Sequence, residues 1–333
     1  MKKTLLFLFA ILIFALVACS NGNNNTSNDV ESSNNEDKEV ITIGYQKGNT
    51  INILKENGNL DEALNEAGYT IDWKVFPTGT VLLEALNTNN IDFGHASDGN
   101  AVFMQAGGHP LNYVASEAPY AEGVALVTKV ESDIETVEDL KGKTIGVTRG
   151  GNKHYLLLVA LAEAGISQDE VDIKFYKDAA EGLSAFTIDE FDVYGTWDPY
   201  LAIVEDTVET RTVVNGSGLT ENRTFYFATD DLLSDKPEVV KVILEELQVA
   251  DLWANDNKTE VAEILAEELG LDVAPLQQAN DRRTFGVEEI GDEIIASQQK
   301  LADTFFEAEL LETEVNVEEA VNVDEAIIPD NIN

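Results

Sequence analysis

The feature that most constrains the fold is a regular alternation of short apolar strands and amphipathic helices from residue 40 onward. Residues 40–45 and 70–76 alternate apolar and polar side chains, as half-buried strands do. Residues 49–56, between them, carry apolar side chains along one side of a helix. The same pattern then predicts a helix opening at Thr78 and strands over 91–94, 111–115 and 123–128. Strands that alternate with helices predict an open parallel sheet with helices on both faces.

A second unit of the same kind begins near residue 129. Its pattern predicts strands over 143–147, 171–176 and 191–197, and helices over 154–164 and 179–188. One more strand is predicted over 224–229. The rest of the chain is predicted to form helices over 237–255, 258–269, 273–283 and 288–309. A chain of 333 residues has room for two such units with buried cores. The predicted fold class is therefore α/β, in two units.

The N-terminal sequence is typical of a targeting segment. Two lysines precede an unbroken apolar run of fourteen residues, 5–18, which is shorter than the ~20 residues that span a bilayer. It fits the apolar region of a secretory signal peptide. The run ends at Leu16-Val17-Ala18-Cys19, which resembles the bacterial lipoprotein processing box, and this resemblance implies a lipid anchor on Cys19. We expect a signal peptide over 1–18 and a flexible tether over 19–39, since the latter is rich in Asn, Ser, Asp and Glu.

Composition excludes several classes of function. The chain has 62 Asp and Glu against 21 Lys and Arg, a formal net charge of −41, so it offers no basic stripe for nucleic acid. Its single cysteine rules out an intrachain disulfide and a Cys-rich zinc site. With three histidines, there is little material for a histidine-based metal or catalytic centre. We expect no metal and no cofactor.

A set of short motifs follows in a fixed order between residue 41 and about residue 325. The motifs cover 43–55, 83–87, 91–94, 139–143, 154–157, 197–202, 282–283 and 298–303. In this order they resemble the substrate-binding proteins of aliphatic-sulfonate ABC importers. Wider relatives of that family bind taurine, nitrate, bicarbonate or thiamine-precursor pyrimidines, and these ligands stay open as alternatives.

The resemblance implies a two-lobed, periplasmic-binding-protein-like clamp of type II. Two α/β lobes, 40–127 plus 224–333 and 128–223, would be joined by crossover strands near 126–128 and 224–226. It implies a monomer, anchored to the outer face of the cytoplasmic membrane, that delivers an alkanesulfonate to a permease and its ATPase. The same fold hosts a desulfinase and a pyrimidine synthase that rely on cysteines in the site. Because the only cysteine here is at the lipid position, we expect no enzyme.

Two loops that precede helices are candidates for holding the anion, because N–H groups at a helix start carry partial positive charge. For the first loop, an ordinary capped turn is the alternative. Lys153 could add a positive charge at the second loop, or could be a solvated lysine. The candidate residues are Ser97, Asp98, Gly99 and Asn100 in the first loop, and Gly151, Asn152, His154 and Tyr155 in the second.

Five further residues complete the candidate site. Gln46 ends the first strand and can donate or accept a hydrogen bond. Trp197 can form an apolar wall for the alkyl part, and Asp198 could hold a positive group on the ligand. Tyr226 lies on the returning strand, and Arg283 is the candidate for a charge-assisted bond to the sulfonate. For each of these residues a purely structural role is the alternative.

Overall fold

The computed structural model describes residues 38–322, 324 and 326–332. The predicted signal peptide, the lipidation site at Cys19 and the tether up to residue 37 lie outside the described residues. Strand β1 already begins at Glu39, inside the range expected for the tether. In the described part of the chain, no helix is long and apolar enough to cross a membrane.

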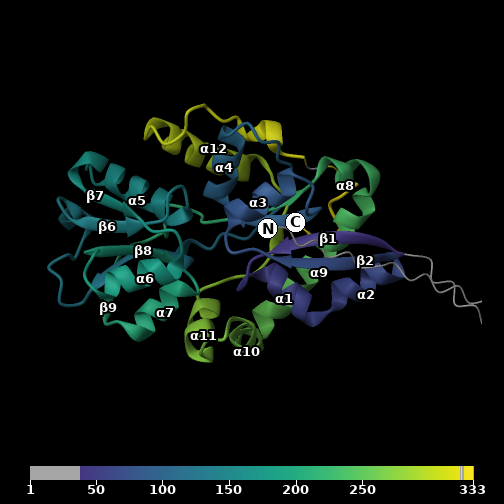
Figure 1. The fold of residues 1–333 in the computed structure, drawn as a ribbon, viewed down its shortest axis with the longest axis horizontal. Coiled ribbons are helices and arrows are strands. Elements are labelled where there is room, and N and C mark those ends of the chain that lie inside the picture. The colour runs from purple at the N-terminus through teal and green to yellow at the C-terminus, as the bar shows by residue number, and fades with distance from the viewer. Residues whose placement is uncertain (1–37, 323, 325, 333) are drawn as a thin grey trace, which may run out of the picture. The chain divides into compact units, whose positions relative to one another are not determined.

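The first sheet contains six strands in the order β11-β4-β10-β3-β1-β2. Figure 1 labels its strands β1 and β2. Strand β1 pairs in parallel with β2 and β3, whereas β10 runs antiparallel to β3 and β4. The strands are β1 (Glu39–Tyr45), β2 (Tyr69–Val75), β3 (Phe93–Ser97), β4 (Tyr113–Glu117), β10 (Thr224–Ala228) and β11 (Val287–Glu288).

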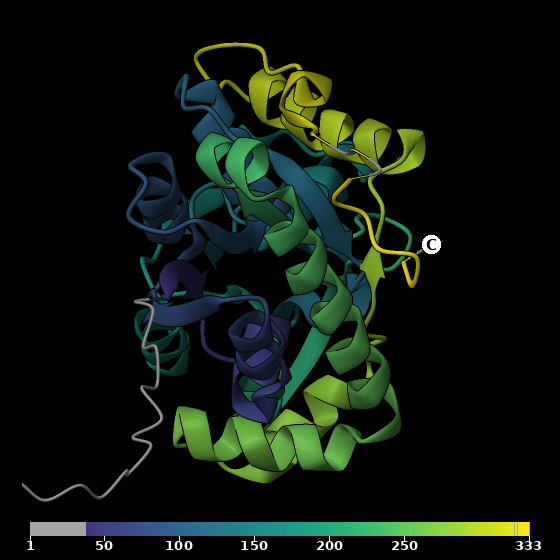
Figure 2. The same ribbon diagram turned by 90° about the vertical axis from the view of Figure 1, so that its right-hand side faces the viewer.

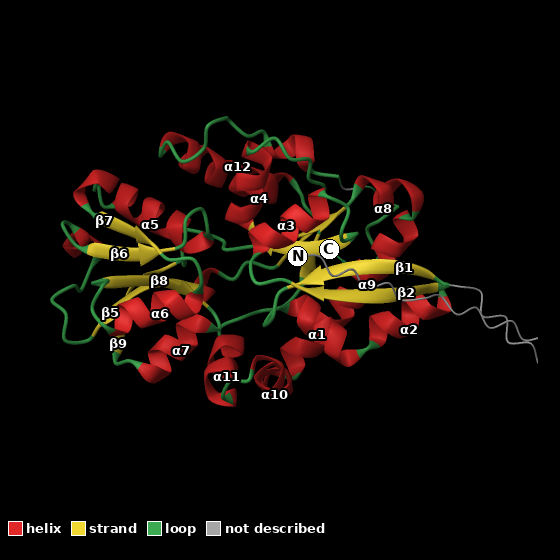
Figure 3. Cartoon of the chain, viewed as in Figure 1, coloured by secondary structure: helices red, strands yellow, loops and turns green. Residues whose placement is uncertain are grey.

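The second sheet has five strands in the order β7-β6-β8-β5-β9. Strand β6 pairs in parallel with β7 and β8, and β5 is antiparallel to β8 and β9. The strands are β5 (Val124–Lys129), β6 (Thr144–Val147), β7 (Asp172–Phe175), β8 (Val193–Trp197) and β9 (Thr210–Asn215). Figure 3 shows the two sheets as separate groups of strands, each with its own helices.

Both sheets are mixed, so the prediction of purely parallel sheets was wrong. Strands β10 and β5 each enter their sheet after the chain has crossed from the other lobe. A parallel partner requires a connection, usually a helix, that returns over the same sheet, and a direct crossing does not provide one.

The predicted position of the first crossing was also wrong. Residues 126–128 lie within β5, and all the partners of this strand belong to the second sheet. The chain crosses between Glu117 and Val124, and returns between Asn215 and Thr224. Side chains of β5 alternate between two cores: Val124 and Leu126 join one and Ala125 and Val127 the other.

Helices cover both sheets. Some α-helices begin or end at residues suited to that position: Asn49 caps α1, Pro237 opens α9, and Gly270 closes α10 in the left-handed conformation. The α-helices are α1 (Thr50–Asn57), α2 (Asn59–Glu66), α3 (Gly79–Asn87), α4 (Asp98–Ala106), α5 (Asn152–Glu163), α6 (Ala179–Thr187), α7 (Tyr200–Thr207), α8 (Asp230–Asp235), α9 (Pro237–Asp256), α10 (Lys258–Leu269), α11 (Val273–Asp281) and α12 (Asp292–Glu307). Short 3-10 helices cover Ala121–Gly123, Val137–Leu140, Gln168–Glu170 and Val317–Ala320.

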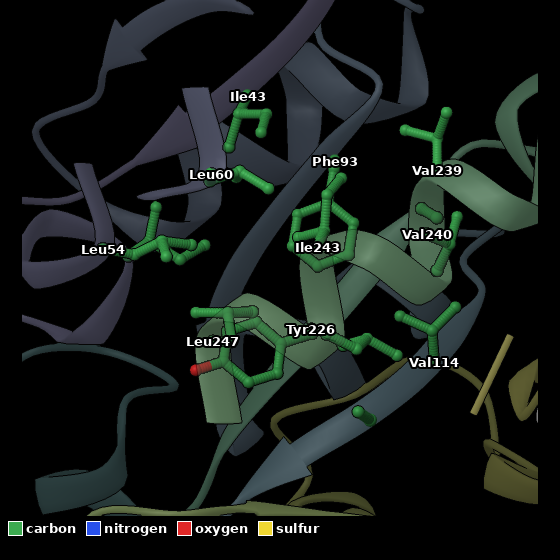
Figure 4. Packing of buried hydrophobic residues seen from close by; sticks show 14 of the residues in the cluster. Ile43, Leu54, Leu60, Phe93, Val114, Tyr226, Val239, Val240, Ile243 and Leu247 are labelled. Carbon is green, nitrogen blue, oxygen red and sulfur yellow. The ribbon is translucent and has the colours of Figure 1, made fainter. Parts of the chain in front are cut away.

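The long helix α9 packs its apolar side on the first sheet. Its residues Ile243 and Leu247 meet Ile43 of β1 and Tyr226 of β10 in one buried cluster (Figure 4). Figure 2 shows the length of this helix from the side. On the opposite face, α3 packs Leu82, Leu83 and Leu86 into a second cluster.

A further apolar cluster joins the lobes. Val102 of α4 and Phe305 of α12 pack against Tyr155 of α5, the helix that covers the second sheet. Phe103 and Phe305 meet edge to face with ring centroids 5.1 Å apart. The two lobes are therefore packed together along the α4, α5 and α12 side.

Candidate functional site

A cleft of about 1020 Å³ lies between the two sheets. It is lined by the residues that follow the carboxyl ends of β1, β2 and β3 in the first sheet and of β6, β7 and β8 in the second. These are the ends at which open α/β sheets hold their ligands. The cleft therefore takes equivalent loops from both lobes.

Eight of the residues expected from the sequence line this cleft. Two amide side chains there are already hydrogen-bonded: Asn100 Nδ2 donates to Thr80 Oγ1 at 3.1 Å, and Asn152 Nδ2 donates to Asn222 Oδ1 at 2.6 Å. Ser97 Oγ donates to Asn100 Oδ1 at 2.8 Å. The eight residues are Gln46, Ser97, Asn100, Gly151, Asn152, Trp197, Asp198 and Arg283.

Two expected residues of the first loop do not line the cleft. Helix α4 begins at Asp98, and the side chain of Asp98 is buried and accepts the Gly99 N–H at 2.7 Å. Burial raises the pKa of Asp98 to about 6. Gly99 lies against the backbone of Gly150, where a Cβ would come within 2.3 Å of the carbonyl oxygen. This pair brings the two candidate loops into contact, and only a glycine fits at this point.

Three more expected residues are also outside the cleft lining. His154 Nδ1 accepts the Gly150 N–H at 3.1 Å, which orders the second loop from behind. Tyr155 belongs to the cluster between the lobes. Tyr226 is fully buried, and its hydroxyl donates to Glu117 at 2.7 Å. These side chains support the cleft and do not face it.

Arg283 lines the cleft, but its charge is already compensated. Its guanidinium donates to the buried carboxylate of Glu117 and to Thr50 Oγ1. Glu117 also accepts the Thr50 hydroxyl at 2.6 Å. Arg283 is therefore part of a buried hydrogen-bond network in the wall of the cleft.

Asp198 is compensated in the same way. It accepts from the Tyr120 hydroxyl at 2.5 Å and from the Ala202 N–H at 3.1 Å, and it pairs with Arg282 at 3.2 Å. Arg282 also pairs with Glu205 at 2.7 Å. Burial raises the pKa of Asp198 to about 6. The carboxylate thus has partners within the protein and does not need a positive group on the ligand.

Lys153 is a cleft residue that the sequence left open, and it is not solvated. It lies in the first turn of α5 with 6% of its surface exposed. Its Nζ is 3.5 Å from the centroid of the Trp197 ring, and no carboxylate of the described residues pairs with it. Burial lowers the pKa of Lys153 to about 7, although the charge of Asp98 acts in the opposite direction.

His95 is a cleft residue that the sequence reading missed. It lies in β3, because this strand continues three residues beyond its predicted end at 94. The Gln46 N–H donates to its Nε2 at 3.0 Å. Burial, with nearby Arg283, lowers the pKa of His95 to about 3, so this ring is neutral and takes part as a hydrogen-bonding group. The short apolar pattern of β3 held no signal that would have placed it at the cleft.

Apolar side chains form part of the cleft wall. Trp197 and Tyr200 pack edge to face at 5.0 Å, and Tyr176 lies on the same side of the second lobe. Val75 and Phe175 lie at the cleft with 53% and 47% of their surfaces exposed. The cleft thus combines polar groups with surfaces suited to a hydrocarbon. In the part of the chain that the structure describes, no three His, Cys, Asp or Glu side chains gather as around a metal ion.

Comparison with known proteins agrees with this geometry. Residues 56–260 match the family model described as NMT1/THI5 like. A protein of Escherichia coli (strain K12), named as a candidate aliphatic sulfonates-binding protein, is 30% identical over 284 residues, covering 85% of this chain and 88% of that protein. The taurine-binding periplasmic protein of the same strain is 27% identical over 207 residues, covering 60% of this chain and 62% of that protein.

Solved structures show the same arrangement. The periplasmic aliphatic sulphonate binding protein SsuA from Escherichia coli matches with a TM-score of 0.80 and 29% identity, covering 85% of this chain and 92% of that one. The alkanesulfonate-binding protein SsuA from Xanthomonas axonopodis pv. citri, bound to MOPS, matches with a TM-score of 0.79 and 30% identity, covering 86% and 98%.

Two mixed α/β lobes with a cleft at their strand ends define a type II periplasmic-binding-protein fold, the class of the ABC-transporter solute-binding proteins. Within this class, the chain belongs to the NMT1/THI5-like family. Its relatives at about 30% identity are binding proteins and not enzymes, as the resemblance implied.

Proposed function

We propose that this protein binds aliphatic sulfonates outside the cytoplasmic membrane and delivers them to an ABC importer. The observation that carries the proposal is the cleft at six strand ends, which holds hydrogen-bonding groups and an apolar wall side by side. A sulfonate needs donors for its oxygens, and its alkyl chain needs a surface that removes it from water.

The charges at the cleft favour a simple alkanesulfonate over an aminosulfonate such as taurine. An ammonium group would need an uncompensated carboxylate. Asp198 already pairs with Arg282, and Glu117 already pairs with Arg283. The third carboxylate of the cleft lining, Asp178, is exposed to water and caps α6 by accepting the Glu181 N–H at 3.0 Å. The names of three relatives at about 30% identity, which are sulfonate-binding proteins, support the same ligand class.

The transport partners belong to the same proposal. A lipid on Cys19 would hold the protein at the outer face of the membrane, where about 0.8 kcal/mol per buried CH₂ adds to its membrane affinity. The ligand-bound form would dock on a permease driven by an ATPase. Ligand shifts the open–closed equilibrium only by contacts that differ between the two forms.

Calorimetric titration tests the ligand class. The panel contains ethanesulfonate, pentanesulfonate, taurine, sulfate, nitrate and a hydroxymethylpyrimidine. We expect the alkanesulfonates to bind at micromolar concentration or below, and nitrate and the pyrimidine to give no heat. Pentanesulfonate should bind more tightly, since each CH₂ buried on the apolar wall adds about 0.8 kcal/mol, or about fourfold in Kd. Heat from nitrate or the pyrimidine alone would keep the fold and the transport role but overturn the sulfonate assignment.

A further inference from the structure

We infer that Lys153, and not Arg283, is the residue whose positive charge selects the anionic group of the ligand. The inference rests on the proposed function and names the residue that carries its charge recognition. It starts from a comparison of the cationic side chains at the cleft.

Three other cations that line the cleft already have carboxylate partners. Because these carboxylates already neutralise the cations in the free protein, an added anion gains little binding energy from them. These pairs are Arg283 with Glu117, Arg223 with Glu221 and Glu288, and Lys47 with Glu268. Arg149 and Lys177 also line the cleft, but both are exposed to water, and Arg149 stacks on Phe175 at 5.7 Å.

Lys153 differs from all of these because it is buried and has no ion-pair partner among the described residues. Its ammonium lies on the face of Trp197, which compensates the charge only in part. Asp98 of α4 acts on the charge of Lys153, and Lys153 in turn acts, together with Arg149, on His154 of its own helix. His154 is neutral near pH 7, because burial lowers its pKa to about 4.

Asp98 does not form an ion pair with Lys153. Its carboxylate is buried behind the first loop, hydrogen-bonded to the Gly99 N–H, and it does not line the cleft. Lys153 does line the cleft. An anion in the cleft is therefore the one partner that can approach the ammonium directly and replace the water it lost on folding.

Among the described residues that line the cleft, Lys153 is the one buried cation without a carboxylate partner, and this also sets the charge of the preferred ligand. One sulfonate balances Lys153, whereas the second negative charge of sulfate would enter the cleft without a buried counter-charge. Lys153 should thus favour a monoanion with a hydrocarbon part over an inorganic dianion.

The test is titration calorimetry of the purified full chain with pentanesulfonate, sulfate and nitrate. The K153M variant removes the charge but keeps a flexible apolar stem against Trp197. The matched control is K300M, which removes an exposed lysine of α12 that does not line the cleft. We expect K153M to weaken pentanesulfonate by about 10–100-fold, as for the loss of a charge-assisted hydrogen bond, and K300M to change it by less than about threefold.

The outcomes separate this inference from the proposed function. Tight pentanesulfonate binding that survives in K153M would overturn the role of Lys153 and leave the sulfonate assignment standing. Nitrate binding alone, lost in K153M, would overturn the sulfonate assignment and support Lys153. Absence of heat from every anion would contradict both. If K153M does not fold, K153R in its place should bind within about tenfold of the parent protein, and a loss as large as that expected for K153M would count against a charge-based role.

Discussion

At the scale of single residues, the cleft separates charges that stabilise the fold from a charge that is available to a ligand. Arg283, which the sequence indicated as the residue that binds the sulfonate, and its neighbour Arg282 are both neutralised by buried or half-buried carboxylates. Lys153, which the sequence left ambiguous, is buried without such a partner among the described residues. Burial and pairing, and not residue type, distinguish these roles.

The pH dependence of binding follows from the lowered pKa of Lys153, about 7. Below this pH the amine is charged and binds an anion; above it the charge is lost, while a sulfonate stays ionised. Affinity for pentanesulfonate should therefore fall as pH rises above about 7, approaching tenfold per unit. Titrations between pH 5 and 9 measure this, and K153M should show no such fall. A flat profile in the parent protein would contradict the prediction.

The Arg283–Glu117 pair gives a prediction about stability. Replacing Arg283 by Met leaves Glu117 buried with its charge unpaired, which costs about 3–5 kcal/mol of folding free energy. Urea denaturation measures the loss. The double variant E117Q/R283M, which removes both charges, should recover a large part of it. Equal stabilities of the two variants would show that the unpaired carboxylate is not the cause.

At the scale of elements, the contact of α5 with α4 and α12 matters most, because it packs the second lobe on the first. Phe305 of α12 is fully buried there, against Tyr155 and His154 of α5. The sequence predicted each of these helices but not their contact. Apolar periodicity identifies the buried side of a helix and does not identify the partner helix.

Truncation of Phe305 tests this contact. F305A should destabilise the protein by about 3–5 kcal/mol, since it leaves a cavity in a closed core. F175A is the matched control, because this phenylalanine is 47% exposed, and it should cost less than about 1 kcal/mol. Denaturant midpoints of the two variants give the comparison. Similar losses in both would show that the cluster does not hold the lobes.

At the scale of the whole molecule, the net charge of −41 opposes the capture of an anion. Salt shortens the Debye length from ~30 Å at 0.01 M to ~8 Å at 0.15 M, which screens the distant carboxylates more than a contact with Lys153. Affinity for pentanesulfonate should therefore rise several-fold between these salt concentrations. Calorimetry with sucrose as the non-ionic control measures it, and an affinity that falls steadily with salt would contradict the prediction.

The proposed membrane anchor also belongs to the scale of the whole molecule. If Cys19 carries the lipid, then Cys19→Ala should move the exported protein from the membrane fraction to the surrounding medium. Cys19→Ser keeps the size of the side chain and should act in the same way, because it also removes the thiol that is acylated. Membrane association that persists in both variants would overturn the proposed anchor.

The sequence by itself determined the α/β class, the two units and the family, because periodicity and ordered motifs are local properties of the chain. It also indicated that loops after strands β3 and β6 lie near the cleft. It did not determine the mixed sheets, because antiparallel pairing of β5 and β10 depends on where the chain crosses between lobes. Only the tertiary structure decided which cations are compensated, since Glu117 lies 166 positions from Arg283 along the chain, and Lys153 meets Trp197 only across the fold. Coulomb energy and desolvation depend on distance and burial in space, and no local pattern encodes either.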